Sequence, residues 1–166
     1  DPTYPALAAS NGARHVLGSG LLLGAFVDAE LDGQPDATAT GDDVAGVPND
    51  EDGVVFTSVL IPGSMATVTV TASAPGLLGA WVDFDNNGSW AHPGEQIFTS
   101  TALVAGPNAV SFSVPPGATL GPQTFARFRL STAGGLSPTG FALDGEVEDY
   151  ALGSIHGQKL EDTNAN

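Results

Sequence analysis

Hydrophobic and polar residues alternate along several short stretches of this chain. Residues 65–71 read MATVTVT, so that small apolar side chains alternate with threonines. Residues 109–114 read AVSFSV and place their large apolar side chains on one face. In residues 125–130, FARFRL, two arginines interrupt an apolar run. A period of two is typical of β-strands, because successive side chains point to opposite faces. We expect further strands at residues 54–60, 77–83, 95–99 and 147–152.

Glycine and proline mark the turns between these runs. The chain contains 22 glycines and 12 prolines, and the triplets IPG, APG, GPN and PPG fall between the predicted strands. Such a composition disfavours helices and suits short strands joined by tight turns. Seven or more short strands at this spacing predict an all-β fold, a β-sandwich of the jelly-roll or immunoglobulin-like type.

The length of 166 residues suits one domain with its own core. We expect a single β-sandwich domain over residues 1–152, in which an N-terminal wrap of residues 1–52 precedes the strands of residues 53–152. Within the wrap, residues 16–26 favour one or two strands. Residues 153–166 are typical of an unstructured tail or linker.

The chain is strongly acidic, with 19 acidic residues, 4 basic residues and a net charge of −15. A phosphate backbone would repel this surface, so we expect no nucleic-acid partner. No run of about 18 apolar residues is present, so we expect no membrane insertion. The chain lacks cysteine, which excludes disulfides and thiolate metal sites but does not exclude secretion.

The acids gather in three groups, whereas residues 53–82 and 96–126 carry no charge. Like charges in such numbers repel one another unless cations neutralise them. Residues 28–52 hold nine acids but too much glycine and proline for regular structure, so we expect bound calcium to order this segment. Its candidate ligands are Asp28, Glu30 and Asp43 first, and then Asp32, Asp42, Asp50 and Asp52. A late group provides further candidate ligands: Asp144, Glu146, Glu148 and Asp149.

The loop of residues 83–95 reads DFDNNGSWAHPGE and has the D-x-[DN]-x-[DN]-G form of a calcium loop. Calcium takes roughly 6–8 oxygen ligands at about 2.3–2.6 Å, which such alternation supplies. Glu95 is the thirteenth residue instead of the twelfth, and a strand precedes the loop, so we expect an EF-like loop on a β-hairpin. The alternative is a polar hairpin turn that binds nothing. The predicted ligands are Asp83, Asp85, Asn87, Ser89 and Glu95.

Residues 145–150 read GEVEDY, and further motifs are DEDGV at 50–54, WVDFDNNG at 81–88 and ARFRLS at 126–131. With these motifs the chain resembles the GEVED domain family over roughly residues 11–152. The resemblance implies a β-sandwich module of large secreted or cell-surface bacterial proteins, adhesin-like in use. It implies no enzymatic reaction.

Three further residues are candidates for ligand binding. Trp90 lies on the predicted calcium loop and offers a stacking platform for a sugar ring, unless it covers the base of the loop. Arg127 and Arg129 share one face of a strand. We expect them to pair with carboxylates of the late acidic group, and the alternative is a clamp for an acidic peptide or sugar.

Catalytic signals are weak. The three histidines are far apart in sequence, and H-E-x-x-H, G-x-S-x-G and P-loop motifs are absent, so we expect no enzyme. We expect a calcium-stabilised, monomeric binding or spacer module of a large extracellular or cell-surface bacterial protein, acting in adhesion or substrate attachment. Its ligand would be a glycan or an extracellular protein. The alternatives are a carbohydrate-binding module of a polysaccharide-degrading enzyme and a hydrolase domain.

Overall fold

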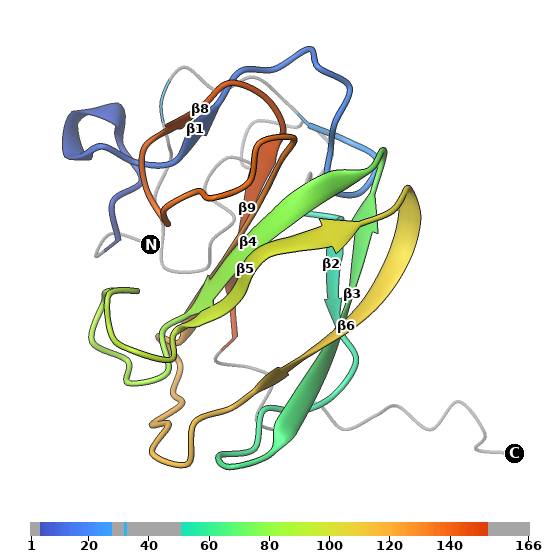
Figure 1. Ribbon diagram of the computed structural model, residues 1–166. Helices are drawn as coiled ribbons and strands as arrows, with labels where there is room; N and C mark the ends of the chain where they lie inside the picture. The colour runs from blue at the N-terminus through green and yellow to red at the C-terminus, as the bar shows by residue number, and fades with distance from the viewer. Residues whose placement is uncertain (1–3, 28–31, 33–50, 153–166) are drawn as a thin grey trace, which may run out of the picture.

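A computed structural model describes residues 4–27, 32 and 51–152 of the chain (Figure 1). A short 3₁₀-helix, η1 (Ala8–Ser10), lies near the start of this part. The strands, in chain order, are β1 (Arg14–His15), β2 (Val54–Phe56), β3 (Met65–Ala72), β4 (Gly76–Val82), β5 (Gln96–Leu103), β6 (Gly106–Ser113), β7 (Phe125–Ser131), β8 (Phe141–Ala142) and β9 (Glu146–Ala151).

Two antiparallel sheets make up most of the fold. One has the strand order β5-β4-β7-β9 and the other has the order β2-β3-β6. The short strands β1 and β8 pair in parallel, and Figure 1 shows them together beyond one end of the sheet that contains β4. The all-β sandwich predicted from the sequence is therefore confirmed. Within the described residues, no helix is long and apolar enough to cross a bilayer.

The main core lies between the two sheets and follows the predicted alternation. In β3, every second side chain is buried, among them Val68 and Val70, while the residues between them are more exposed. These side chains belong to one cluster with Leu78 of β4 and Phe128 and Leu130 of β7. Strand pairing alone is marginal in water, so this shared apolar contact stabilises both sheets.

Strand β7 is buried along its whole length, which the sequence pattern did not predict. Its second face carries Arg127 and Arg129, and protein covers that face too. A smaller cluster of Tyr4, Trp81, Trp90 and Phe125 lies there. The N-terminal segment therefore packs against the outer face of this sheet and reaches the loop between β4 and β5.

Each strand predicted in residues 53–152 has a counterpart, although β2 covers only Val54–Phe56 of the predicted residues 54–60 and β5 extends to Leu103. The short strand β8 was not predicted. In residues 16–26, by contrast, no strand forms, and Leu23 makes only an isolated bridge with Ala72. Three glycines in this segment have positive φ: Gly18, Gly20 and Gly24, at 100°, 75° and 65°. Left-handed backbone interrupts the extended conformation that a strand requires, so the apolar residues here pack without pairing.

Candidate metal site

The loop of residues 83–95 joins β4 to β5 and is drawn in yellow-green in Figure 1. Its ends are held together by a backbone hydrogen bond of 2.9 Å from Val82 N to Glu95 O. The chain reverses through Asn86 and Gly88, whose φ values are 59° and 81°. Asparagine and glycine tolerate this left-handed region best, so the Asn-Asn-Gly sequence determines where the loop turns.

Asp83 organises the loop from the inside. Its side chain is fully buried, and its carboxylate accepts hydrogen bonds from the backbone N–H groups of Asn87 at 3.1 Å and Gly88 at 2.9 Å. The hydroxyl of Tyr4 also donates to this carboxylate. Asp83 thus fixes the turn and ties the loop to the N-terminal segment.

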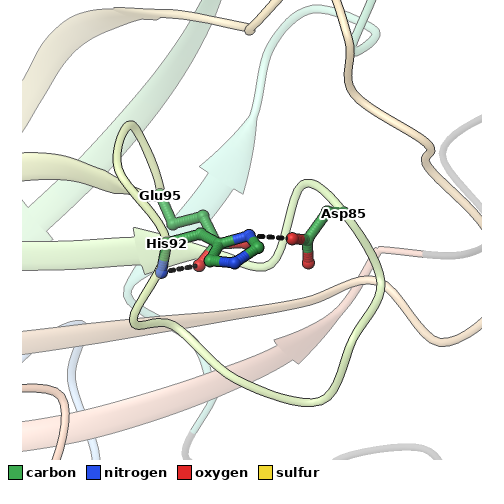
Figure 2. A group of neighbouring side chains, drawn as sticks. All are labelled: Asp85, His92 and Glu95. Carbon is green, nitrogen blue, oxygen red and sulfur yellow. Dashed lines mark hydrogen bonds and ion pairs between the residues drawn. The ribbon is translucent and has the colours of Figure 1, made fainter.

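Three side chains of the loop converge, as Figure 2 shows: Asp85, His92 and Glu95. Each offers a possible metal-ligand atom, and these atoms lie within 4.8 Å of one another. The imidazole Nδ1 of His92 lies against Asp85 Oδ2. The backbone N–H of His92 donates to Glu95 Oε2 at 2.9 Å.

Buried oxygen atoms without hydrogen-bond partners lie on the same loop. They are Asp85 Oδ1, Asn86 Oδ1 and Glu95 Oε1. An unpartnered buried polar atom is costly, and native proteins rarely leave one without water or an ion. Three such oxygens on one loop of 13 residues fit the donor set of a hard divalent cation.

The charge on Glu95 is unfavourable without a cation. Only 2% of this residue is exposed, and burial raises the pKa of its carboxyl to about 7. The negative charges of Asp85 and Asp83 raise it further, while the hydrogen bond from His92 opposes the rise. A bound cation would reverse this balance, because positive charge favours the ionised carboxylate.

The structure brings together only part of the predicted ligand set. Asp85 and Glu95 point to the common centre, whereas Asn87 donates its amide N–H to Asp85 at 2.9 Å. Ser89 Oγ accepts the backbone N–H of Ala91 at 3.2 Å. Sequence reasoning missed His92, although its position three residues before Glu95 on the same turn was a usable signal.

The acidic segment is only partly described. Asp28, Glu30, Asp42, Asp43 and Asp50 lie outside the described residues, so their predicted role as ligands stays a prediction. Asp32 accepts the backbone N–H of Ala8 at 2.7 Å. Asp52 accepts the N–H of Ala25 at 3.0 and 3.2 Å. Among the described residues, neither joins a group of three side chains that could hold a metal.

Two glutamates of the late acidic group bind backbone donors of distant segments. Glu146 accepts the N–H of Leu23 at 2.6 Å. Glu148 accepts the N–H of Gly53 and the hydroxyl of Tyr150, both at 2.9 Å. Both carboxylates are almost fully buried on β9. They attach the N-terminal segment to the sheet directly, where we had expected metal ions to do so.

The two aspartates of this group are also committed to protein partners. Asp144 accepts the backbone N–H of Thr132 at 3.0 Å and its hydroxyl. Asp149 receives two hydrogen bonds from Arg127, at 2.7 and 2.5 Å. Within the described part of the chain, these four acids form no common cluster. Asp144, Glu146, Glu148 and Asp149 were predicted as further ligands for a metal held by residues 28–52. In the structure each of these carboxylates has a protein donor. A site shared with residues 28–31 and 33–50 lies outside the described residues and stays a prediction.

Trp90 is not an exposed stacking platform, since only 6% of it is accessible. Its ring stacks on the ring of Tyr4, with the two centroids 4.1 Å apart. The Arg127 guanidinium lies over the Trp90 ring, 4.6 Å from the ring centroid, in a cation–π contact. This arrangement matches the alternative interpretation, a tryptophan that covers the base of the loop. Aromatic and cationic contacts of this kind stabilise the buried ring.

The two arginines are structural and do not form a ligand clamp, because both are buried. Arg127 pairs with Asp149, as predicted. Arg129 instead donates to the carbonyls of Ser137, Thr139 and Gly140 at 2.7–2.9 Å and to His15 Nε2 at 3.0 Å. Because His15 Nε2 accepts a hydrogen bond from Arg129, this nitrogen carries no proton and the ring is neutral. Burial together with the charge of Arg129 lowers the pKa of His15 to about 4.

A cavity of about 400 Å³ adjoins the loop. Residues 91–94 form one side of it, residues 136–138 form another, and Trp81, Trp90 and Gln96 complete the lining. Because His92 lines this cavity and also belongs to the converging cluster, the loop and the cavity share a wall.

Comparison with known proteins gives one match. Residues 77–153 match the family model of the GEVED domain, which takes in the strands from β4 to β9 and the loop of residues 83–95. Neither the curated proteins nor the solved structures give a match to the chain.

Proposed function

Since residues 77–153 belong to the GEVED domain family, we propose that this chain is a calcium-stabilised, non-catalytic module of a large extracellular bacterial protein. In that setting it would attach the protein to a surface or substrate, or space its neighbouring domains. The observation that carries the proposal is the set of buried oxygens without partners on the loop of residues 83–95.

The donor chemistry favours calcium for this structural role. Carboxylate and amide oxygens are ligands that Ca²⁺ prefers, and Asp85, Asn86 and Glu95 supply them from one loop. The ion would neutralise two carboxylates that otherwise repel each other. Weak all-oxygen sites are filled at the millimolar calcium concentration outside cells, which supports an extracellular setting.

A calcium ion here would also stabilise more than the loop itself. Asp83 connects the loop to Tyr4, and Trp90 stacks on the same tyrosine. Ordering the loop therefore orders the contact between the N-terminal segment and the sheet. Rigid modules of this kind suit both spacing and attachment.

Thermal melts of the full chain in chelator and in millimolar calcium test this proposal. We expect calcium to raise the melting temperature by many degrees in the wild type and to have little effect on Asp85→Asn. The matched control is Asp144→Asn, which removes the same charge at an aspartate that binds Thr132 and should keep the calcium response. Identical wild-type melts in both conditions would contradict a stabilising metal.

Glycan binding is the second candidate, and the cavity beside the loop supports it. About 400 Å³ is room for a small ligand, with hydrogen-bonding groups on Gln96 and Ser137 at its lining. A glycan array with the isolated chain tests this function. Binding that is lost in Gln96→Ala would support a carbohydrate-binding module, and an array without signal would favour a spacer.

A further inference from the structure

His92 introduces a nitrogen ligand into a loop whose other donors are oxygens. Its ring lies between the carboxylates of Asp85 and Glu95 (Figure 2). Calcium is coordinated by oxygen, whereas imidazole suits zinc, copper, nickel and iron. The converging side chains therefore differ in chemistry from the oxygen set that the loop sequence predicts.

The backbone holds two of the three side chains in a fixed relation. The N–H of His92 donates to Glu95 Oε2 at 2.9 Å, and the N–H of Glu95 donates to His92 O at 3.2 Å. These reciprocal bonds close one turn, so that the two residues are positioned before any ion arrives. Preorganisation of this kind lowers the entropy that binding would otherwise cost.

Glu95 provides an independent indication of a ligand. Only 2% of this residue is exposed. One of its carboxylate oxygens, Oε2, accepts the N–H of His92, and the other, Oε1, has no hydrogen-bond partner. Asp85 Oδ1 is likewise buried and without a partner. Both free oxygens belong to the residues whose ligand atoms converge with the imidazole.

We propose that Asp85, His92 and Glu95 form a three-ligand site for a divalent transition-metal ion of the zinc class, with water completing its coordination. The inference rests on the loop of the proposed function, and it adds a second class of ion that competes with calcium for Asp85 and Glu95. Two carboxylates neutralise the charge of a divalent cation, and the neutral imidazole adds a nitrogen ligand. Three protein ligands with water are a common zinc arrangement.

The geometry requires only a small adjustment. Ligands of a tetrahedral zinc ion at about 2.1 Å lie roughly 3.4 Å apart, and the three present atoms lie within 4.8 Å. The His92 side chain is 63% exposed, so its ring can move toward the ion without disturbing the core. Glu95 and the turn supply the fixed part of the site.

Calorimetric titration of the tag-free chain with Zn²⁺, with and without millimolar Ca²⁺, tests the proposal. We expect one Zn²⁺ per chain, weakened by Ca²⁺. Loss of a residue that only supports a metal ligand costs about 10–100-fold in metal affinity, and loss of a ligand itself should cost more. His92→Gln should therefore lower Zn²⁺ affinity by at least about 100-fold, while Ca²⁺ affinity stays within about threefold. His156→Gln, the same substitution outside the loop, is the matched control and should bind Zn²⁺ as the wild type does.

No Zn²⁺ binding to the wild type, or equal affinity in His92→Gln, would overturn the inference and leave the calcium proposal intact if Ca²⁺ still binds. If neither ion binds, both proposals fail. Should His92→Gln lose both ions, the ¹⁵N shifts of the wild-type His92 ring decide. Movement of these shifts with Zn²⁺ but not with Ca²⁺ supports nitrogen ligation, and unchanged shifts with Zn²⁺ refute it.

Discussion

Replacing Glu95 by glutamine should stabilise the metal-free protein and remove its response to calcium. In the metal-free state, Glu95→Gln abolishes a charge that burial and the neighbouring Asp85 and Asp83 disfavour. The amide oxygen can still accept the N–H of His92, which now binds Oε2. The amide N–H₂ then replaces Oε1, an oxygen that has no donor.

The magnitude follows from the pKa of Glu95, which rises from 4.5 to about 7 on folding. A tenfold change in proton affinity corresponds to about 1.4 kcal/mol, so the ionised carboxylate destabilises the fold by at most about 3 kcal/mol above pH 7. Solvent screening near the partly exposed Asp85 and His92 reduces this to about 1–2 kcal/mol. At roughly 2–4 °C per kcal/mol, the variant should melt about 2–8 °C higher in chelator at pH 8.

Calcium should reverse this order. Saturation at 100 times the dissociation constant stabilises a folded protein by about 2.7 kcal/mol, and the variant forgoes that gain because a neutral amide replaces a carboxylate ligand. Differential scanning calorimetry at pH 8 measures both arms. The control is Glu146→Gln, a buried glutamate that binds Leu23 N, and it should keep the full calcium shift. A variant that melts below the wild type in chelator, or that keeps the calcium shift, would refute the reasoning.

Three further substitutions test the surrounding structure. Arg129→Leu removes a fully buried cation that donates to a histidine and three backbone carbonyls, so chemical denaturation should show a loss of about 3–5 kcal/mol; a loss below about 1 kcal/mol would contradict that role. Burial raises the pKa of the Glu148 carboxyl from 4.5 to about 7, so the fold favours its neutral form. The stability that the protein gains from this neutral carboxyl is fully present below pH 4.5 and is lost as the pH rises through 7. Unfolding free energies between pH 5 and 8 should therefore fall more steeply in the wild type than in Glu148→Gln, and parallel curves would argue against the shift. Gly145→Ala places a Cβ 1.8 Å from Leu130 O at a φ of 81°, and we expect its soluble yield and melting temperature to fall sharply, whereas wild-type behaviour would mean that the turn relaxes without cost.

The sandwich could be predicted from the sequence because strand periodicity is a local property. The alternation in residues 65–71 and 109–114 corresponds to β3 and β6. One face of β3 is buried, and β6 contributes the buried Phe112 and the half-buried Val110 to the same core. The strand prediction for residues 16–26 was wrong for a local reason as well, since the glycines of this segment adopt positive φ. Apolar content alone did not reveal that interruption.

The sequence predicted the position of the candidate site but only some of the residues that form it. Spacing identified the loop of residues 83–95, and Asp85 and Glu95 converge there. The loop spacing predicted Asp83 as a ligand, but in the structure its carboxylate binds the hydroxyl of Tyr4. The local sequence could not reveal this partner, because Tyr4 lies 79 residues earlier in the chain. The burial of Trp90 has the same origin, since its ring stacks on that tyrosine.

The late acidic group shows which partners of a charge cluster the sequence does not reveal. Glu148 finds its donor at Gly53, 95 residues earlier, and Glu146 finds one at Leu23, 123 residues earlier. On a strand, side chains two apart share one face, so both glutamates face the N-terminal segment. Backbone N–H groups from distant segments donate hydrogen bonds to these carboxylates. No sequence pattern within residues 144–149 predicts such partners.

A crystal structure of the full chain grown in millimolar calcium, with anomalous scattering recorded, tests the central claim most directly. We predict an anomalous peak on the loop of residues 83–95, about 2.3–2.6 Å from oxygens of Asp85 and Glu95, which is the calcium–oxygen range. Density that contains only water at this place, with the His92 ring still against Asp85, would contradict the account.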